Sequence, residues 1–531
     1  MNTFAKSFAF LLILISVSVY AQVGQIDPAA YGYYKDALRF SQLYFKGGTA
    51  RYLALGGAGI ALGADPATAS VNPAGLGLYR KSEFSFSPNF GFLNTESDYT
   101  GNRMKDNRSS FSFSNLSAVF CGAVDDFVEK DWRGGTFSIN FSRTNNFNNQ
   151  FSYSGVNRNN SMADYFLQLT ENTYFTTDGL DEQNPDGQTG ILDLQGLAYW
   201  TWLTNAYIDN NGKTRYYTFI QDETVLQEET VVNTGAQYEW NFAFGGNYKD
   251  KIYVGASVNV PTIRYTNERT YSEKVGAIVL GSFREKPDTL VSFTYTDYLK
   301  VTGTGINVKF GFLMKATEAF RLGLTLQSPT YYAMRDNYKS GLTTLFDGTP
   351  VPLIGGGTYV LESFSEETIS GDFRYSFIAP MRAGIGASLF SGKAGFVSGE
   401  IEYIPYGFST FSAKSAGSSA FTADNKTIKN IYKSGLAYRM GGEIRFDIFR
   451  LRAGGSYQPD PTVISDGVNR SLLQICAGGG IKLDEMYFDI ALVNSRVKTL
   501  FIPYILKDAS EPKINIKHSA INFVITAGFN F

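Results

Sequence analysis

The chain has 531 residues, of which 18% are charged, and its formal net charge is −2. So balanced a charge provides no basic surface, and we expect no nucleic-acid partner. One histidine and two cysteines without ligand spacing exclude a histidine triad and give no basis for a metal site or a cofactor. The 54 glycines, 43 phenylalanines and 34 tyrosines are instead typical of a wall of strands with aromatic girdles.

Residues 1–21 form the first predicted element, a signal peptide for export. Lys6 supplies the positive charge, Phe8–Val19 is apolar but too short to span a bilayer, and Val19-Tyr20-Ala21 offers a small-residue cleavage site. No later stretch is apolar over the roughly 18 residues that a membrane helix needs. An exported chain of this kind is soluble, lipid-anchored or a β-barrel, and no cysteine lies near the cleavage site to carry a lipid.

Residues 22–82 are predicted to form an N-terminal helix followed by a compact plug, or hatch. The pattern of Ala29–Phe45 predicts a short amphipathic helix. Residues 47–76 are small, apolar and rich in glycine, so they fold tightly but bury too little surface to be stable alone. Residues 72–75 (Asn-Pro-Ala-Gly) predict a turn, because asparagine bonds to nearby backbone and proline cannot donate to a ladder. The segment therefore needs a container.

Residues 83–531 are predicted to be that container, because apolar and polar side chains alternate along many short stretches. In the last of them Ile521, Phe523 and Ile525 alternate with polar and small residues. In a membrane barrel the apolar face meets lipid and the polar face lines the lumen. Fourteen stretches carry the pattern: 84–92, 110–121, 134–144, 235–249, 251–263, 301–315, 318–328, 372–390, 393–406, 432–447, 449–459, 472–483, 485–495 and 517–531.

The connections between these stretches decide between a soluble sandwich and a membrane barrel. Those after the even-numbered stretches are short, as at 249–251, whereas those after the odd-numbered stretches are mostly long, and 145–234 is the longest. Short turns on one side and long loops on the other are typical of bacterial outer-membrane barrels. The sequence therefore predicts an all-β fold: a 14-stranded antiparallel transmembrane β-barrel with an N-terminal hatch in its lumen and both termini in the periplasm.

The hatch resembles that of the FadL/TodX family of outer-membrane channels for long-chain fatty acids and other hydrophobic compounds. The matching residues are Gly48-Thr-Ala-Arg51, Leu55-Gly-Gly-Ala58, Asp65 and Asn72-Pro-Ala-Gly-Leu76, together with Leu326–Thr330 and Ala379–Gly386. The terminal Phe531 resembles the C-terminal aromatic signal by which outer-membrane barrels are inserted. The resemblance implies that ligand enters between extracellular loops and that a shift of the hatch releases it through a wall opening beside a kinked strand. It also implies that Arg51, Asn72, Pro73 and Ala74 form the gate; the alternative is a purely structural turn.

Charged side chains of both signs fall on the predicted lumen face of the strands. Opposite charges held close together pair and hydrogen-bond, so we expect a network that holds the plug. One or two of the arginines could instead grip a carboxylate. The residues predicted to face inward are Glu239, Glu400, Glu402, Glu443, Arg374, Arg382, Arg439, Arg445, Arg450 and Arg452.

Aromatic residues cluster in the longest predicted loop, where two helices are expected at Met162–Thr170 and Leu192–Ile208. Such a cluster needs an apolar partner. It is interpreted either as a groove that captures substrate or as the core of the loop or a membrane-interface belt. The residues concerned are Phe166, Tyr199, Trp200, Trp202 and Leu203.

Together these features predict a channel in the outer membrane of a Gram-negative bacterium that admits fatty acids or other hydrophobic small molecules by passive diffusion. We expect a monomer without a cofactor, whose partners are the substrate, outer-membrane lipid and the barrel assembly machinery that reads the terminal Phe531. Three alternatives are an adhesion barrel, a haem receptor with tyrosine ligation, and an enzyme that uses His518. Cys121 and Cys476 are interpreted as small wall residues, with a disulfide as the alternative.

Overall fold

A computed structural model describes residues 26–531 except 28–29, 31, 43–46, 125–129, 185–189, 221–223, 276–289, 349, 353–356, 415–416 and 418. The predicted signal peptide, residues 1–21, lies outside the described residues. Among the helices of the described residues, none combines the length and the apolar character needed to cross a membrane.

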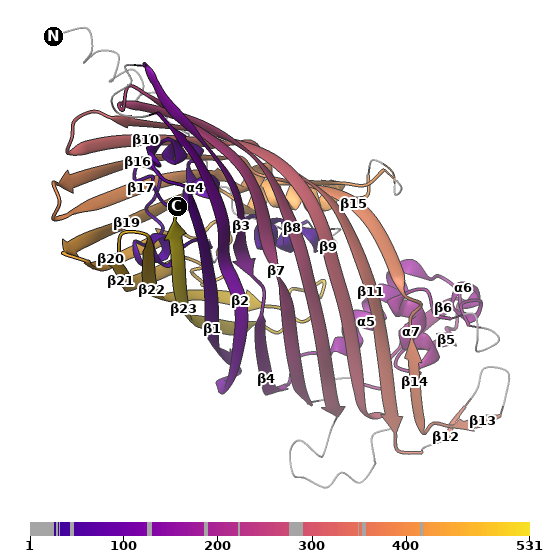
Figure 1. The fold of residues 1–531 in the computed structure, drawn as a ribbon. Helices are drawn as coiled ribbons and strands as arrows, with labels where there is room; N and C mark the ends of the chain where they lie inside the picture. The colour runs from indigo at the N-terminus through magenta and orange to yellow at the C-terminus, as the bar shows by residue number, and fades with distance from the viewer. Residues whose placement is uncertain are drawn as a thin grey trace.

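The wall is a closed antiparallel β-barrel of 14 strands, as the alternating sequence pattern predicted (Figure 1). The first strand pairs with the last, Glu83 lying opposite Asn530, so the sheet has no free edge. Nine wall strands are single elements: β1 (Glu83–Tyr99), β2 (Asn102–Ala123), β7 (Val225–Tyr248), β8 (Ile252–Val275), β9 (Leu290–Lys315), β19 (Ser434–Phe446), β20 (Phe449–Gln458), β21 (Leu472–Lys482) and β22 (Met486–Phe501). A tenth, β23 (Ile514–Asn530), closes the circle.

The remaining four wall strands consist of shorter pieces in line. They are β3 (Trp132–Asn146) with β4 (Asn149–Asn157); β10 (Phe320–Gln327) with β11 (Thr330–Phe346); β14 (Ser363–Glu367) with β15 (Gly371–Ala379) and β16 (Arg382–Ser391); and β17 (Gly395–Pro405) with β18 (Thr410–Ser412). Pro329 and Pro380 stand at two of the breaks, where a missing amide hydrogen interrupts a ladder.

The strands on one side of the barrel are much longer than the sequence pattern indicated. β8 and β9 continue to Val275 and back from Leu290, whereas alternation predicted 251–263 and 301–315. In this upper part both faces carry polar side chains, so the periodic signal fades although the ladder continues. For the same reason, the predicted loop 145–234 contains β4 and the first ten residues of β7 within the wall.

The outward face carries a belt of exposed apolar side chains, as expected of a surface that meets acyl chains. Phe86, Phe90 and Phe113 on β1 and β2 belong to it, and Phe86 and Phe113 are in ring contact, as are Phe90 and Phe111. Further members on the other strands are Trp240, Phe242, Val258, Ile306, Phe310, Leu324, Leu326, Tyr331, Ile385, Leu389, Ile401, Tyr438, Met440, Leu451, Ile475, Ile490 and Leu492.

Residues 47–79, the hatch, lie inside one end of this barrel, near the C-terminus (Figure 1). The hatch contains α3 (Ala50–Ala54), α4 (Thr68–Val71) and the 3₁₀ helix η1 (Pro73–Leu78). Nearly all of its residues are buried, although the segment is too small to bury itself. The wall therefore provides the burial, as the sequence predicted.

Above the hatch, a second layer fills the lumen. The predicted helix at Ala29–Phe45 is shorter in the structure, α2 (Tyr33–Ser41), and packs against α9 (Thr422–Ile431) and η2 (Tyr406–Phe408). Phe40 contacts Phe377 and Tyr265 of the wall, which places α2 across the middle of the barrel.

The far end of the barrel carries a small helical insert, the cluster of helices in Figure 1. It comprises α5 (Met162–Thr173), α6 (Asp178–Asp181), α7 (Leu194–Trp200), β5 (Asn205–Ile208) and β6 (Thr214–Tyr217), and a hairpin of β12 (Pro350–Pro352) and β13 (Thr358–Val360) lies nearby. The predicted helix Leu192–Ile208 is wrong in its second half. Trp202 has a left-handed backbone (φ 61°), which ends the helix, and residues 205–208 form a strand.

Candidate functional site

The Asn-Pro-Ala turn of the hatch rests on a row of glycines in the wall. Gly245, Gly255 and Gly311 are directly opposite one another on β7, β8 and β9, and all three face the lumen. A side chain on Gly255 would overlap the backbone of Pro73, and one on Gly311 would overlap the amide oxygen of Asn72. Glycine is therefore required here because two backbones touch.

Asn72 fixes the turn to this row. Its side-chain amide donates to the carbonyl oxygens of Ile60 (2.7 Å) and of Phe312 on β9 (3.2 Å), while its amide oxygen accepts from the Ala74 N–H. Asn72 is fully buried. The predicted gate residues Asn72, Pro73 and Ala74 thus join hatch and wall, although β7–β9 are continuous there, so the turn does not face an interrupted strand as we expected.

A second glycine contact holds the opposite side of the hatch. Gly441 of β19 and Gly454 of β20 are in register, and the backbone at Leu55 and Gly56 lies directly on them. A third pair, Gly323 and Gly386, faces Ile60: Gly323 meets its backbone, and Gly386 meets its side chain. The hatch therefore touches bare wall backbone on several sides.

The predicted charge network exists and ties the hatch to β17, β19 and β20. Arg439 pairs with Glu400 (2.8 Å) and Glu402 (2.7 Å), and Glu400 also accepts the N–H groups of Gly59 and Ile60 at 2.9 Å. All three charged side chains are buried. Because a buried charge without its partner is costly, Glu400 fixes the hatch backbone to the wall, and Glu402 holds Arg439 in place beside it.

Arg382 and Arg445 also take part, as predicted. Arg382 lies 3.8 Å from Glu402 and donates to the Ser41 carbonyl at the end of α2. Arg445 pairs with Glu443 at 2.7 Å, and Arg452 bridges Glu443 to Asp489. The network therefore reaches both the hatch and the layer above it.

Arg51 links the hatch to this network. Its guanidinium lies 3.5 Å from Glu443 of the wall and 3.6 Å from Asp65 of the hatch, and it donates to the Ala64 carbonyl. Burial alone would lower the pKa of Arg51, but the two carboxylates outweigh it and raise that pKa. Arg51 is thus a permanent cation that joins the hatch to the wall.

Two predictions about the lumen charges are wrong. Glu239 faces inward but belongs to a different structure, since it accepts hydrogen bonds from the amides of Asn241 (2.6 Å) and Asn307 (3.5 Å) instead of an arginine. Arg374 faces outward because Tyr375 and Phe377 are the inward residues of β15. The break at Pro380 obscures the alternation from which its direction was predicted.

An asparagine ladder crosses the lumen face of five strands and was missed by sequence reasoning. Each amide donates to the next over 2.6–2.8 Å, and its last member, Asn307, donates to Thr330 at 3.1 Å. All members are buried. An asparagine at a lumen-facing position of each successive strand was the available signal; the ladder runs Asn115, Asn140, Asn241, Asn259 and Asn307.

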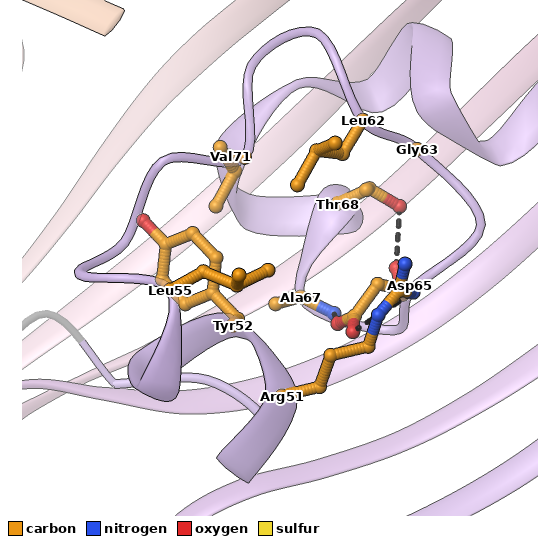
Figure 2. Close-up of a pocket in the computed structure, with 10 residues that line it drawn as sticks. Arg51, Tyr52, Leu55, Leu62, Gly63, Asp65, Ala67, Thr68 and Val71 are labelled. Atoms are coloured by element: carbon orange, nitrogen blue, oxygen red, sulfur yellow. Dashed lines mark hydrogen bonds and ion pairs between the residues drawn. The ribbon is translucent and has the colours of Figure 1, made fainter. Parts of the chain in front are cut away.

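The inside of the hatch is closed. The cavity in Figure 2 has a volume of about 10 Å³, roughly the space of one water molecule, and Arg51, Tyr52, Asp65 and Val71 are among its lining residues. Figure 2 shows the Arg51 side chain extending to Asp65 along one side of it. The cavity is too small to hold a hydrophobic ligand.

The wall itself has an interruption on one side. The ladder between β2 and β3 ends where Asn115 faces Ser142; beyond it β4 pairs with β7 alone among the described strands. Higher up, side chains close the seam, for example Asp106, which accepts from the Ser152 N–H at 2.7 Å. We call the remaining interval, residues 109–114 of β2 opposite 143–148, the wall gap.

The start of the hatch fills the wall gap from inside. The Gly47 N–H donates to the Arg143 carbonyl at 2.7 Å, and the Gly48 N–H donates to the Ser114 hydroxyl at 3.1 Å. Asn145 donates to the carbonyl of Gln42 just after α2. These bonds replace the ladder that β2 and β3 do not form, so Gly47 and Gly48 are the hatch residues at the interrupted strand.

The aromatic residues predicted to capture substrate lie in the helical insert but differ in exposure. Phe166 and Leu203 are fully buried in its core. Trp200 is half-buried and donates to the Leu180 carbonyl at 3.0 Å. Tyr199 bonds to Asp181, and Trp202 stacks on Tyr359, with ring centroids 5.6 Å apart. Of the five predicted residues, Phe166 and Leu203 thus belong to the core of the loop, whereas Tyr199 and Trp202 lie nearer its surface.

Lys35 on α2 is a cation in the middle of the lumen. Its side chain is partly exposed, but desolvation by the surrounding protein lowers its pKa to about 8. The positive charges of Arg269 and Arg39 lower this pKa further. Asp36, its neighbour on the helix, acts in the opposite direction. Both cysteines are free, and within the described residues no group of three side chains could hold a metal ion.

The fold and these contacts define a membrane-type β-barrel closed by an internal hatch. Solved structures with this fold include the toluene transporter TodX of Pseudomonas putida (TM-score 0.50, 16% identity, 92% of this chain and 99% of that one) and a FadL homologue of Pseudomonas aeruginosa (TM-score 0.53, 11% identity, 92% and 99%). No family model and no curated protein matches the sequence. The chain has the fold of the FadL/TodX channels, and that prediction is confirmed.

Proposed function

We propose that this protein is an outer-membrane channel of a Gram-negative bacterium for the passive uptake of long-chain fatty acids or other hydrophobic small molecules. Movement of the hatch would gate the diffusion. The observation that carries the proposal is the wall gap, which Gly47 and Gly48 fill with backbone hydrogen bonds from inside the barrel.

The chemistry of such a substrate explains the need for a side exit. Exposing an apolar chain to water costs about 0.8 kcal/mol for each CH₂ group, so a water-filled pore is a poor route. A route that leaves through the wall keeps the chain out of bulk water. Gly47 and Gly48 bond to the wall at the gap through three hydrogen bonds, since the Ser114 hydroxyl also donates to the Gly48 carbonyl. The Arg143 side chain donates across the same gap to the Ser112 hydroxyl at 2.6 Å. Because each such bond is worth about 0.5–1.5 kcal/mol net, a small shift of the hatch and of this side chain would open the gap.

We place the entrance at the opposite end, beside the helical insert. Trp202 and Tyr359 offer a partly exposed aromatic surface there, and Tyr199 lies nearby. Phe166 and Leu203 support that surface from beneath because they are fully buried. In the membrane we expect a monomer, assembled by the barrel machinery that recognises the terminal Phe531.

The decisive experiment pins the hatch to the wall. Ile60 of the hatch and Gly386 of β16 are so close that a Cβ on Gly386 would lie 3.0 Å from the Ile60 Cβ, and a modest shift brings this to disulfide geometry. The double variant Ile60→Cys/Gly386→Cys, with Cys121 and Cys476 changed to Ser, should lose uptake of labelled oleate when oxidised. Reduction should restore it.

A matched control joins two wall strands and leaves the hatch free. Ala453 of β20 and Ala477 of β21 are register partners on the outward face. Oxidised Ala453→Cys/Ala477→Cys should take up oleate as the unlinked protein does. Full uptake by the oxidised hatch variant would contradict gating, and equal uptake by cells with and without the protein would contradict transport and favour a barrel for surface adhesion.

A further inference from the structure

A row of arginines crosses the outward face of the wall. Arg264 on β8, Arg335 on β11 and Arg374 on β15 are all exposed, and their strands are neighbours around the barrel, with β9 between the first two. Thr302 of β9 lies directly between Arg264 and Arg335 in register. The row therefore forms one line across four strands.

These arginines line a hollow in the outer surface with a volume of about 790 Å³. Thr262, Thr304 and Tyr238 contribute hydroxyl groups to it. The hollow extends to Phe111 and the buried Arg143 at the wall gap, and the buried Ile263 and Met334 also line it. It is therefore lined by cationic, hydroxyl, aromatic and aliphatic groups together. Such a lining suits an amphiphile with an anionic head better than a purely apolar molecule.

Arg335 and Arg374 break a rule of sheet pairing. They are directly opposite each other on adjacent strands, and like charges in that position destabilise a sheet. Arg335 is bound by Asp372 at 2.9 Å, but no ion pair to Arg264 or Arg374 occurs in the described part of the chain. Three guanidinium groups thus share one carboxylate, which leaves an excess of positive charge for an external anion.

The position of the row indicates which anion. On β9 the outward residues below it are Ile306 and Phe310 of the apolar belt, whereas Lys300 lies above it. On the neighbouring strand Tyr331 belongs to the belt as well. The arginines therefore lie at the boundary between acyl chains and head groups, on the side of the helical insert.

We infer that this hollow binds the phosphate-bearing head group, with a net negative charge, of an outer-leaflet lipid. Arg264 and Arg374 bind the phosphate, the threonine hydroxyls contact its sugar or glycerol, and the acyl chains lie along Ile306, Tyr331 and Phe111. Arginine suits this role because its planar fork matches phosphate oxygens. The inference requires only that the barrel spans the outer membrane and not that it transports a substrate.

Native mass spectrometry of the delipidated protein in mild detergent tests the inference with four probes: bis-phosphorylated lipid A, phosphatidylcholine, inorganic phosphate and oleate. Wild-type protein should bind one more lipid A than Arg264→Gln/Arg374→Gln, whose affinity should fall about tenfold. Phosphatidylcholine should show no difference between the two proteins. Arg264→Lys/Arg374→Lys should bind with intermediate affinity.

The control removes two outward charges from the opposite side of the wall. Arg496 and Lys498 of β22 are exposed, and Arg496→Gln/Lys498→Gln should bind lipid A as wild type does. Equal lipid A binding by all variants would overturn the inference. Displacement of lipid A by millimolar inorganic phosphate would overturn it in favour of a simple ion site, and arginine-dependent binding of oleate without binding of lipid A would do so in favour of a cargo site. Oleate uptake is measured in a separate experiment, so the lipid-binding result can be interpreted even if the protein does not transport oleate.

Discussion

Gly255 of β8 and Pro73 of the hatch are in backbone contact, because a single added carbon on Gly255 would lie within 2.6 Å of the Pro73 carbonyl oxygen. Gly245 and Gly311 extend the same bare surface onto the two adjacent strands. The hatch therefore contacts the wall at three glycines, because the absence of side chains there lets the two backbones touch.

Replacement of Gly255 by valine should displace the Pro73 turn. Overpacking of this kind costs about 1–3 kcal/mol, so the hatch should loosen while the barrel assembles. Single-channel recordings in planar bilayers should show a raised open probability. Gly399→Val is the control, because an added carbon there meets only the Arg439 carbonyl oxygen, at 3.8 Å; equal recordings from the two variants would contradict the role of the glycine row.

Asn72→Ala should weaken the hatch without affecting the wall. It leaves the carbonyl oxygens of Ile60 and Phe312 without their donor, a loss of about 1–3 kcal/mol. Hydrogen exchange should quicken at residues 59–75 and stay unchanged in β19 and β20. Uniformly quickened exchange would show instead that Asn72 supports the whole barrel.

Arg439→Met should be among the most disruptive single changes in the lumen. Glu400 would be left buried without its cation, and Glu402 would keep only Arg382 at 3.8 Å; breaking a buried pair in this way typically costs about 3–5 kcal/mol. On gels a folded barrel migrates differently from the unfolded chain, and the temperature at which half of the protein has lost the folded band, the midpoint, should fall markedly. Arg103→Met removes an exposed pair with Asp98 and should leave the midpoint unchanged; similar midpoints for both variants would contradict the burial argument.

Lys35 should make stability depend on alkaline pH. Its pKa of about 8 in the folded state lies below the value of 10.5 in the unfolded chain. Below pH 8 the protonated Lys35 therefore lowers the stability of the folded state by its full amount, and this loss disappears as the pH rises from 8 to 10.5. The melting temperature of Lys35→Met should exceed that of wild type at pH 7, and the difference should shrink between pH 8 and 10.5. A difference independent of pH would contradict this assignment.

The sequence was sufficient to predict the barrel because the signals were local. All 14 predicted stretches coincide with wall strands, since the lipid-facing residues alternate wherever the wall crosses the belt. Beyond the belt, around Glu268 and Lys300, lipid no longer selects one face, and the strand ends were missed. The hatch was predictable from its small residues and its turn.

The details of the site depended on long-range register and could not be read from the chain. The glycine row appears only after three strands are aligned, as Gly245, Gly255 and Gly311 are. A single glycine in a strand does not predict a contact with the hatch. Arg374 was assigned to the wrong face because Pro380 interrupts the alternation. The contact of Gly47 with Arg143 was invisible because it joins residues nearly a hundred positions apart.

The asparagine ladder gives the two halves of the cylinder different responses to their surroundings. From Asn115 to Asn307 the cross-strand rungs are neutral amides, whereas around Arg439 and Glu443 they are ionic. Strong acid would therefore weaken the ionic half of the circumference by protonating its carboxylates and leave the amide half unchanged, whereas salt would affect both halves little because the ion pairs are buried. In acid the barrel would then deform mainly on the ionic side, around Arg439 and Glu443, while the strands joined by the asparagine ladder keep their positions.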